Sequence, residues 1–545
     1  MLVPNYSYGA ATLSWADAAG QTQTRQVTAS GTPVQVNPTQ TTIYTLTVRY
    51  QDPTTLRPQE LSSTATATVT VKPTTGVDAF TGTAQADTFS AIVGATGANA
   101  SDTLSASDVL AGGAGTDTLN LTVTATNTAA LNAATLSGIE VINVRAAAAG
   151  VTATVDASTA VGATQVNANQ GPGAVTVTSL ATGAAIGVIG NGTVTNGTTS
   201  YAYATAAAPQ TINVSGGVKG GNITATSSAA VTTATINSTG AANTVGTVLL
   251  ASGAANTVTS LTVNATTDLT ATLTGADYAN TTALVVTGAG KVNVGSAGTF
   301  KTVDASANTG GLTMAIDTVT TSFKGSTAND TITTVTLAAP AAGIIDAGAG
   351  TGDKLVVAAA ADVATSGLRA SYTNFEVLSN GAGASIAASD FTGITSVESS
   401  ATGGSITGLT AAQAENVAVT ATQAAVTYAL TTATGTSDVL GLTLGTGLTT
   451  AAATSVTGGA LTVTGFETLN LKANAGPTAT AGANRISTID SFTGATLKNI
   501  NLTGTSFVLG NIATTVAATI DGSALTGDGS STSVGFTTAG SAVTG

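Results

Sequence analysis

Aspartate residues close a series of glycine-rich turns along this chain, and carboxylates in such turns can bind a metal ion. The clearest turn is Gly-Gly-Ala-Gly-Thr-Asp at 112–117. Turn carbonyls and Asp carboxylates are oxygen ligands, of which Ca²⁺ takes six to eight. The same side chains could instead bond to their own turn backbone, so both roles are open. The aspartates concerned are Asp87, Asp102, Asp108, Asp117, Asp330, Asp346, Asp353 and Asp438.

A glutamate follows three of these turns and begins an apolar strand. A carboxylate beside the edge of a core needs a partner. Either Ca²⁺ or a backbone N–H would serve, and we include these glutamates among the candidate metal ligands. The three pairs are Asp117 with Glu140, Asp353 with Glu376, and Asp438 with Glu467.

The elements that position these carboxylates form a unit that recurs. In residues 110–144 a glycine turn is followed by a strand at 118–123, with Leu119, Leu121 and Val123 facing inward, and then by a linker and a second strand. The same order returns at 346–378 and at 435–471. A unit that recurs with its turn residues intact predicts stacked coils.

Composition favours strands with small side chains. Thr and Val are abundant, and their branched Cβ atoms suit a pleated surface. Short strands with Val-x-Val or Ile-x-Val alternation recur every 15 to 25 residues or so between 145 and 325, about one solenoid coil each. We therefore predict an all-β fold, with a β segment of glycine-aspartate calcium turns at 74–144, a β-solenoid at 145–325 and solenoid repeats at 326–545. Stacked amides or turn residues are the expected roles of Asn213, Asn237, Asn264 and Asn293.

Several classes of function are disfavoured by composition. The chain has no Cys and no His, which removes disulfides, thiol catalysis and the commonest transition-metal ligand. The net charge of −13 argues against nucleic-acid binding. No apolar run is long enough for a transmembrane helix. Because the 14 Lys and Arg residues form no tight cluster with Asp, we expect no enzyme.

Residues 1–73 differ from the rest of the chain. They hold the only Trp, and short strand-like runs at 11–15, 25–29, 33–36, 43–50 and 64–71 predict a β-sandwich. The segment NPTQTTIYTLTVRY, followed by ATATVTVK, resembles bacterial immunoglobulin-like domains. Trp15 and Tyr44 would then be core aromatics.

The glycine turns resemble the nonapeptide repeats of RTX proteins, whose consensus is GGxGxDxLx. Residues 113–119, GAGTDTL, fit it well. The phrases VDASANTGGLT, GFETLNL, LKNINLTG and TIDGSALTG resemble RTX-type surface-layer (S-layer) proteins of Gram-negative bacteria, over about 78–529. That resemblance implies type I secretion, folding with Ca²⁺ outside the cell, and tiling into a lattice. The dense nonapeptide block and C-terminal signal of such proteins are not present, and the immunoglobulin-like segment is additional.

We therefore expect a structural surface-layer protein that self-assembles with Ca²⁺ on the bacterial cell surface. An RTX adhesin or an extracellular filament subunit is the alternative. The expected partner is the chain itself, with cell-surface polysaccharide or lipopolysaccharide as candidate anchor. The start of the chain lacks the pattern of a signal peptide, so we expect an export signal elsewhere or a fragment of a longer protein.

Overall fold

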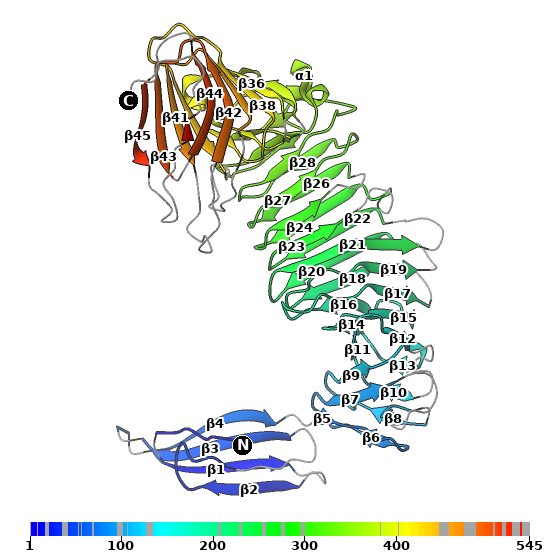
Figure 1. Ribbon diagram of the computed structural model, residues 1–545. Helices are drawn as coiled ribbons and strands as arrows, with labels where there is room; N and C mark the ends of the chain where they lie inside the picture. Colours follow the sequence, from blue (N-terminus) through cyan, green and yellow to red (C-terminus); the bar gives the residue numbers. More distant parts are fainter. Residues whose placement is uncertain are drawn as a thin grey trace. The chain divides into compact units, whose positions relative to one another are not determined.

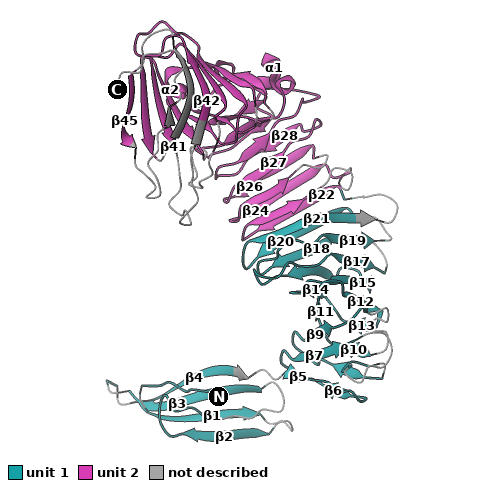
Figure 2. Cartoon of the chain, viewed as in Figure 1, with its two compact units in different colours: residues 1–258 teal, residues 259–545 magenta. Residues whose placement is uncertain are grey.

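A computed structural model describes most of the chain (Figure 1). The description omits residues 1, 8, 17–20, 35–41, 53, 56, 68–69, 95–101, 106, 127–133, 205–208, 228–230, 253–257, 274–277, 279, 296–299, 382, 402, 446–455, 457, 474–486, 505–506, 515–518, 526–534 and 537–545. The chain forms two compact units, residues 1–258 and residues 259–545 (Figure 2).

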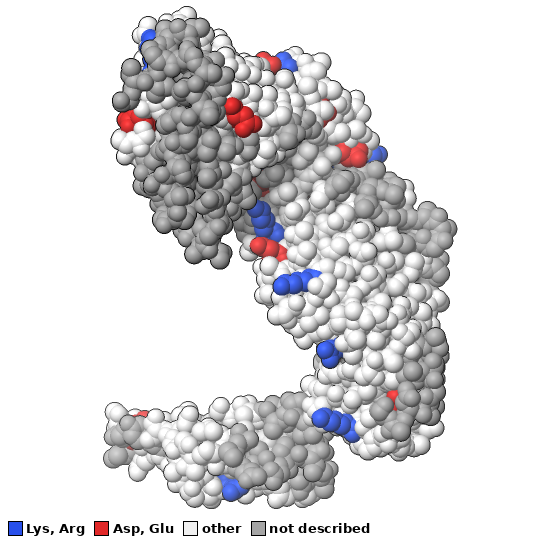
Figure 3. Space-filling model, in the orientation of Figure 1, with Lys and Arg blue, Asp and Glu red and all other residues white. Residues whose placement is uncertain are grey.

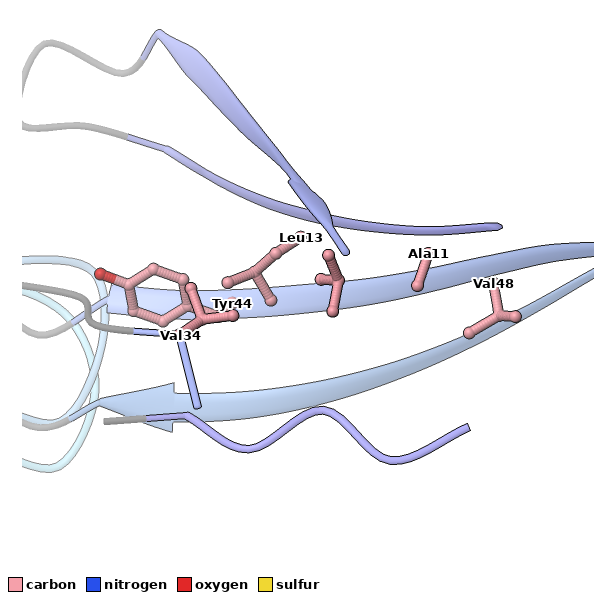
Figure 4. Packing of buried hydrophobic residues seen from close by; sticks show 6 residues of the cluster. Ala11, Leu13, Val34, Tyr44 and Val48 are labelled. Carbon is pink, nitrogen blue, oxygen red and sulfur yellow. The ribbon is translucent and has the colours of Figure 1, made fainter. Parts of the chain in front are cut away.

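The first unit begins with a four-stranded antiparallel sheet in the order β2-β1-β3-β4. Its strands are β1 (Ala10–Ala16), β2 (Thr22–Val27), β3 (Thr42–Gln51) and β4 (Pro58–Ala67). Alternation along β1 and β3 places Ala11, Leu13, Tyr44 and Val48 on one face, where they are buried (Figure 4). Trp15 packs on Tyr44 with ring centroids 5.4 Å apart, so both aromatics belong to this core as predicted.

A two-sheet sandwich is not confirmed in the described part of residues 1–73. The predicted strand at 33–36 is represented there by Val34, which forms an isolated bridge with Leu2. The end of the predicted strand at 64–71 also differs, because Thr70 and Val71 form β5 (Thr70–Val71), which pairs in parallel with β7 (Thr88–Val93). The parallel array thus begins before residue 73.

The rest of the first unit is a parallel β-solenoid, as predicted for residues 145–325. One sheet contains β5, β7, β9 (Thr118–Val123), β11 (Val141–Ala146), β14 (Gln165–Asn169), β16 (Ala185–Ile189), β18 (Gln210–Ser215) and β20 (Thr233–Thr239). A second contains β12 (Thr152–Asp156), β15 (Ala174–Leu180), β17 (Thr199–Tyr203), β19 (Ile223–Ser227) and β21 (Asn243–Ser252). A third contains β6 (Ala79–Thr81), β8 (Val109–Ala111), β10 (Thr135–Ser137) and β13 (Ala160–Val161), the last preceded by the 3₁₀ helix η1 (Ala157–Thr159).

The second unit is also a parallel β-solenoid. Its first sheet contains β22 (Ser260–Ala265), β24 (Ala283–Gly288), β26 (Thr302–Asn308), β28 (Ser322–Lys324), β30 (Ile345–Asp346) and β32 (Tyr372–Thr373). The second contains β23 (Leu269–Thr272), β25 (Val292–Gly295), β27 (Leu312–Ala315), β29 (Thr331–Thr333), β31 (Lys354–Val357), β33 (Val377–Asn380), β35 (Ser396–Ser399), β37 (Val417–Val419), β39 (Val439–Leu444), β41 (Thr468–Ala473), β43 (Asn499–Gly504) and β45 (Thr519–Leu525). The third contains β34 (Ser385–Ala387), β36 (Ser405–Leu409), β38 (Ala425–Leu430), β40 (Ala460–Thr464), β42 (Ser487–Gly494), β44 (Phe507–Thr514) and β46 (Gly535–Phe536).

Helix is scarce in the described residues. The second unit has η2 (Ala360–Val363), α1 (Ser366–Ala370), η3 (Ala388–Asp390) and α2 (Ala411–Ala414). Within the described ranges, no helix has the length and apolar character needed to cross a membrane.

A column of aliphatic side chains fills the solenoid of the first unit. The inward positions of β9 are buried, as predicted for Leu119, Leu121 and Val123. Parallel pairing in register places matching residues above one another, so that each coil buries its apolar residue against the next. One such column is Leu119, Ile142, Val166, Ile186, Ile212 and Ile236.

Asparagine side chains stack between neighbouring strands of the same sheet. Asn143 Nδ2 donates to Asn120 Oδ1, and Asn167 Nδ2 donates to Asn143 Oδ1, both at 2.9 Å. Asn237 Nδ2 donates to Asn213 Oδ1 at the same distance, so stacking of these two amides is confirmed. Asn293 instead accepts from the N–H of Gly295, in the manner of a turn residue.

Candidate functional site

Each of the three recurring Asp–Glu pairs is joined by reciprocal hydrogen bonds between successive coils. The backbone N–H of Asp117, Asp353 and Asp438 donates to Oε2 of its glutamate at 2.8, 2.9 and 2.8 Å respectively. In return, the N–H of Glu140, Glu376 and Glu467 donates to the carbonyl oxygen of its aspartate at 3.1, 3.0 and 2.9 Å. The backbone N–H partner considered for these glutamates is therefore present.

The aspartates extend the same arrangement toward the preceding coil. Asp117 Oδ1 accepts from the N–H of Asp87, and Asp353 Oδ1 accepts from the N–H of Asp330, both at 2.6 Å. Asp87, Asp117 and Glu140 thus occupy equivalent places in three coils, as do Asp330, Asp353 and Glu376. We call each of these two sets a carboxylate ladder. Its carboxylates cap backbone N–H groups that would otherwise be buried without an acceptor.

A glycine lies beside several of the ladder carboxylates, where a larger residue would clash with the carboxylate. A Cβ at Gly112, five residues before Asp117, would lie 1.8 Å from the carbonyl oxygen of Gly138 and 2.5 Å from Asp117 Oδ2. Gly82 and Gly325 are related in the same way to Asp87 and Asp330. The backbone of the next coil and the carboxylate both occupy the space of a side chain, so the spacing Gly-x₄-Asp belongs to a turn with an inward carboxylate.

Several predicted ligands have carboxylates that already accept backbone N–H bonds, either from their own turn or from a neighbouring coil. Asp108 accepts from Asp78 through Oδ1 and from Ser105 through Oδ2, at 2.8 and 2.6 Å. Both oxygens of Asp330 are likewise engaged, by Leu312 and Ser326. Asp87, Asp102 and Asp346 each accept from a neighbouring turn N–H: those of Thr83, Gly94 and Gly348 respectively. These contacts match the turn-forming role that the sequence left open.

One carboxyl oxygen remains buried without a hydrogen-bond partner in each recurring pair. The atoms are Oδ2 of Asp117, Asp353 and Asp438. Burial raises the pKa of Asp117, and it raises that of Asp353 to about 7, with a smaller contribution from the nearby carboxylates Asp330 and Glu376. A proton or a cation would satisfy an oxygen in this state.

The donor set limits what kind of cation site these turns could form. Nowhere in the described residues do three or more Asp or Glu side chains come together as a metal-binding group. A cation at Asp117, Asp353 or Asp438 would therefore bind one carboxyl oxygen and complete its coordination with backbone carbonyls. Calcium tolerates carbonyl ligands and irregular geometry, so the oxygens fit Ca²⁺ better than a thiolate-seeking or imidazole-seeking metal.

Two buried acidic residues were not among the sequence candidates. Glu398 on β35 is 2% exposed and lies 2.5 Å from the Nζ of Lys354 on β31. Asp362 in η2 accepts from the hydroxyls of Thr334 and Thr336 at 2.8 and 2.7 Å. Glu398 ends the sequence Gly-Ile-Thr-Ser-Val-Glu at 393–398, but no sequence signal connects it with a lysine two coils away.

No protein-family model and no curated protein matches the chain.

Proposed function

We propose that the chain is a structural surface-layer protein that self-assembles with Ca²⁺ into a lattice on the outside of a Gram-negative bacterial cell. The observation that carries the proposal is the parallel β-solenoid of both units with carboxylate ladders at its turns. Such a fold is compatible with a structural or repeat protein, because each coil contacts only its neighbours and the array extends by repetition.

The surface supports this role. In the view of Figure 3, the described surface of each unit is mostly uncharged, with isolated Lys, Arg, Asp and Glu side chains. Charged residues are 8% of the chain, and Thr, Ala and Gly predominate. Small uncharged side chains allow close approach of a neighbouring molecule at little desolvation cost.

Calcium enters the proposal through the unpartnered oxygens. Three aspartates, Asp117, Asp353 and Asp438, have a buried Oδ2 without a hydrogen-bond partner. Burying such an oxygen in an ionised carboxylate costs free energy unless a partner compensates its charge. A bound Ca²⁺ would favour the ionised form, join the turn carbonyls of successive coils and oppose the repulsion of an acidic chain. Removal of calcium should therefore loosen the turns and any assembly that depends on them.

The second candidate is an RTX adhesin or a filament subunit. The separate antiparallel sheet β2-β1-β3-β4 ahead of the parallel array favours it, because a stalk with a small β domain is also a design for adhesion. We propose neither form as an enzyme.

Electron microscopy of the purified full chain tests the proposal. With millimolar Ca²⁺ we expect ordered two-dimensional sheets, which disperse in excess EGTA and return when calcium is restored. One-dimensional fibres would favour the filament reading. Dispersed particles at every calcium concentration would refute assembly, and sheets that keep their order in EGTA would refute the role of calcium.

A further inference from the structure

Strand β4 forms an open edge of the N-terminal sheet. Among the described strands it pairs with β3 alone, so the backbone groups on its other side have no strand partner. Beside it lies a surface hollow of about 520 Å³, lined by Leu46, Val48, Tyr50 and Leu61 together with Tyr6 and polar residues. Leu61 is 61% exposed, although it lies opposite the buried Val48 and on the same face.

Along most of its length β4 lacks the features that protect a sheet edge, apart from Pro58 at its first position and Glu60. Sheet proteins usually guard an edge with charged side chains, proline, a bulge or a very short strand. The strand has ten residues, and its register with β3 is continuous from Pro58 to Ala67. Its only charged residue, Glu60, is neutralised within the sheet by Arg49, whose Nε lies 2.8 Å from Glu60 Oε2.

We propose that β4 is a self-association surface, at which two copies of this chain pair their β4 strands antiparallel about a two-fold axis at Ser62. Side chains opposite one another must share a face of the sheet, so the axis passes through a residue rather than between two. An axis at Ser62 places Leu61 opposite Ser63 of the second copy, and Glu60 opposite Thr64. The two Leu61 side chains become diagonal neighbours over the joined hollows.

The occupant is a second copy because the strand complements itself. No charge faces a like charge in this register, and each Leu61 covers the other. A two-fold contact also uses the same patch on both molecules and closes on itself. The inference rests on the proposed function only in that it names one surface through which copies would meet.

Cysteine cross-linking tests the register, and the absence of native Cys makes the test clean. In the full chain, Ser62→Cys should form a disulfide-linked dimer under mild oxidation. Thr47→Cys is the matched control, because Thr47 lies opposite Ser62 one strand further from the edge and should stay monomeric. Equal cross-linking of the two variants, or none with Ser62→Cys, would overturn the proposed pairing.

A charge at the centre of the contact gives an independent test. Leu61→Lys should raise the dissociation constant of the dimer at least tenfold, measured by light scattering after size exclusion. Ile43→Lys adds the same charge on the opposite face of β3 and should leave the dimer intact. A Leu61→Lys variant that dimerises with the affinity of the wild-type chain would refute the inference but not the proposed function. A β4 dimer that never forms sheets would refute the proposed function but not the inference.

Discussion

Asp353 and Glu376 exchange hydrogen bonds between two successive coils of the second unit. The N–H of Asp353 donates to Glu376 Oε2 at 2.9 Å, and the N–H of Glu376 donates to the carbonyl oxygen of Asp353 at 3.0 Å. One bond continues the backbone pairing between strands, while the other comes from a side chain. The Glu376 side chain thus accepts a hydrogen bond that joins two coils, whether or not a cation is also bound.

Removing the Glu376 carboxyl should destabilise the local coils. Glu376→Ala leaves the N–H of Asp353 without its acceptor, at a cost of about 1–3 kcal/mol. Glu376→Gln keeps an acceptor oxygen and should cost less. Hydrogen exchange at the Asp353 amide measures the difference. Equal protection of that amide in wild type and Glu376→Ala would contradict the capping role.

Stability without calcium should depend on the ionisation of Asp353. Burial raises its pKa to about 7 in the folded protein, against about 4 in an unfolded chain. The folded form therefore keeps a proton that the unfolded chain releases. This contribution is fully present below about pH 4 and is lost as the pH rises to about 7.

Asp353→Asn carries no titrating group at this position and should not show that loss. In urea titrations from pH 4 to 8 in EGTA, wild type should lose stability relative to the variant as the pH rises. Parallel pH profiles for the two proteins would show that Asp353 does not titrate in this range.

Gly112 should tolerate no side chain. The Cβ of Gly112→Ala would meet the carbonyl oxygen of Gly138 and Asp117 Oδ2, and we expect a loss of about 3 kcal/mol or more. Gly150→Ala is the control. Gly150 has a φ of +86°, and an added Cβ there would meet no other atom. Its replacement by alanine should therefore lower the free energy of unfolding only through the left-handed backbone conformation, by about 1–2 kcal/mol. Urea unfolding of the two variants gives the comparison, and equal losses would contradict the steric account.

The sequence predicted the solenoid because its turns and strands recur. Alternation alone placed Leu119 and Leu121 inward, and the repeated order of turn and strand singled out Asp117 and Glu140 without predicting that they bond to each other. What recurrence did not decide is the partner of each carboxylate. The N–H of Asp87 belongs to another coil, and the distance along the chain between coils varies with the length of the loops.

The buried ion pair shows a second limit of sequence reasoning. Lys354 and Glu398 lie on strands that are not adjacent, separated by β33, so neither periodicity nor local spacing connects them. The N-terminal sheet shows a third, since a strand pattern at 33–36 does not reveal whether a second sheet forms. Pairing between distant strands depends on tertiary contacts rather than on local propensity.

Breaking the Lys354–Glu398 pair should cost more than breaking an exposed one. Glu398→Gln leaves a partly buried ammonium without its counterion. Because Lys354 is 27% exposed, we expect about 2 kcal/mol, below the cost for a fully buried pair. Glu60→Gln removes the exposed partner of Arg49 and should change stability by less than about 1 kcal/mol. Urea unfolding measures both, and a smaller loss for Glu398→Gln than for Glu60→Gln would contradict this assignment.

Calcium binding by the full chain tests the central claim most directly. In isothermal titration calorimetry at pH 7.5, the wild-type protein should bind Ca²⁺, and the triple variant Asp117→Asn, Asp353→Asn and Asp438→Asn should lose that binding. Asp108→Asn is the control, because both Asp108 oxygens already accept N–H bonds, and it should bind calcium as wild type does. A wild-type protein that binds no calcium, or a triple variant that binds it undiminished, would contradict the account.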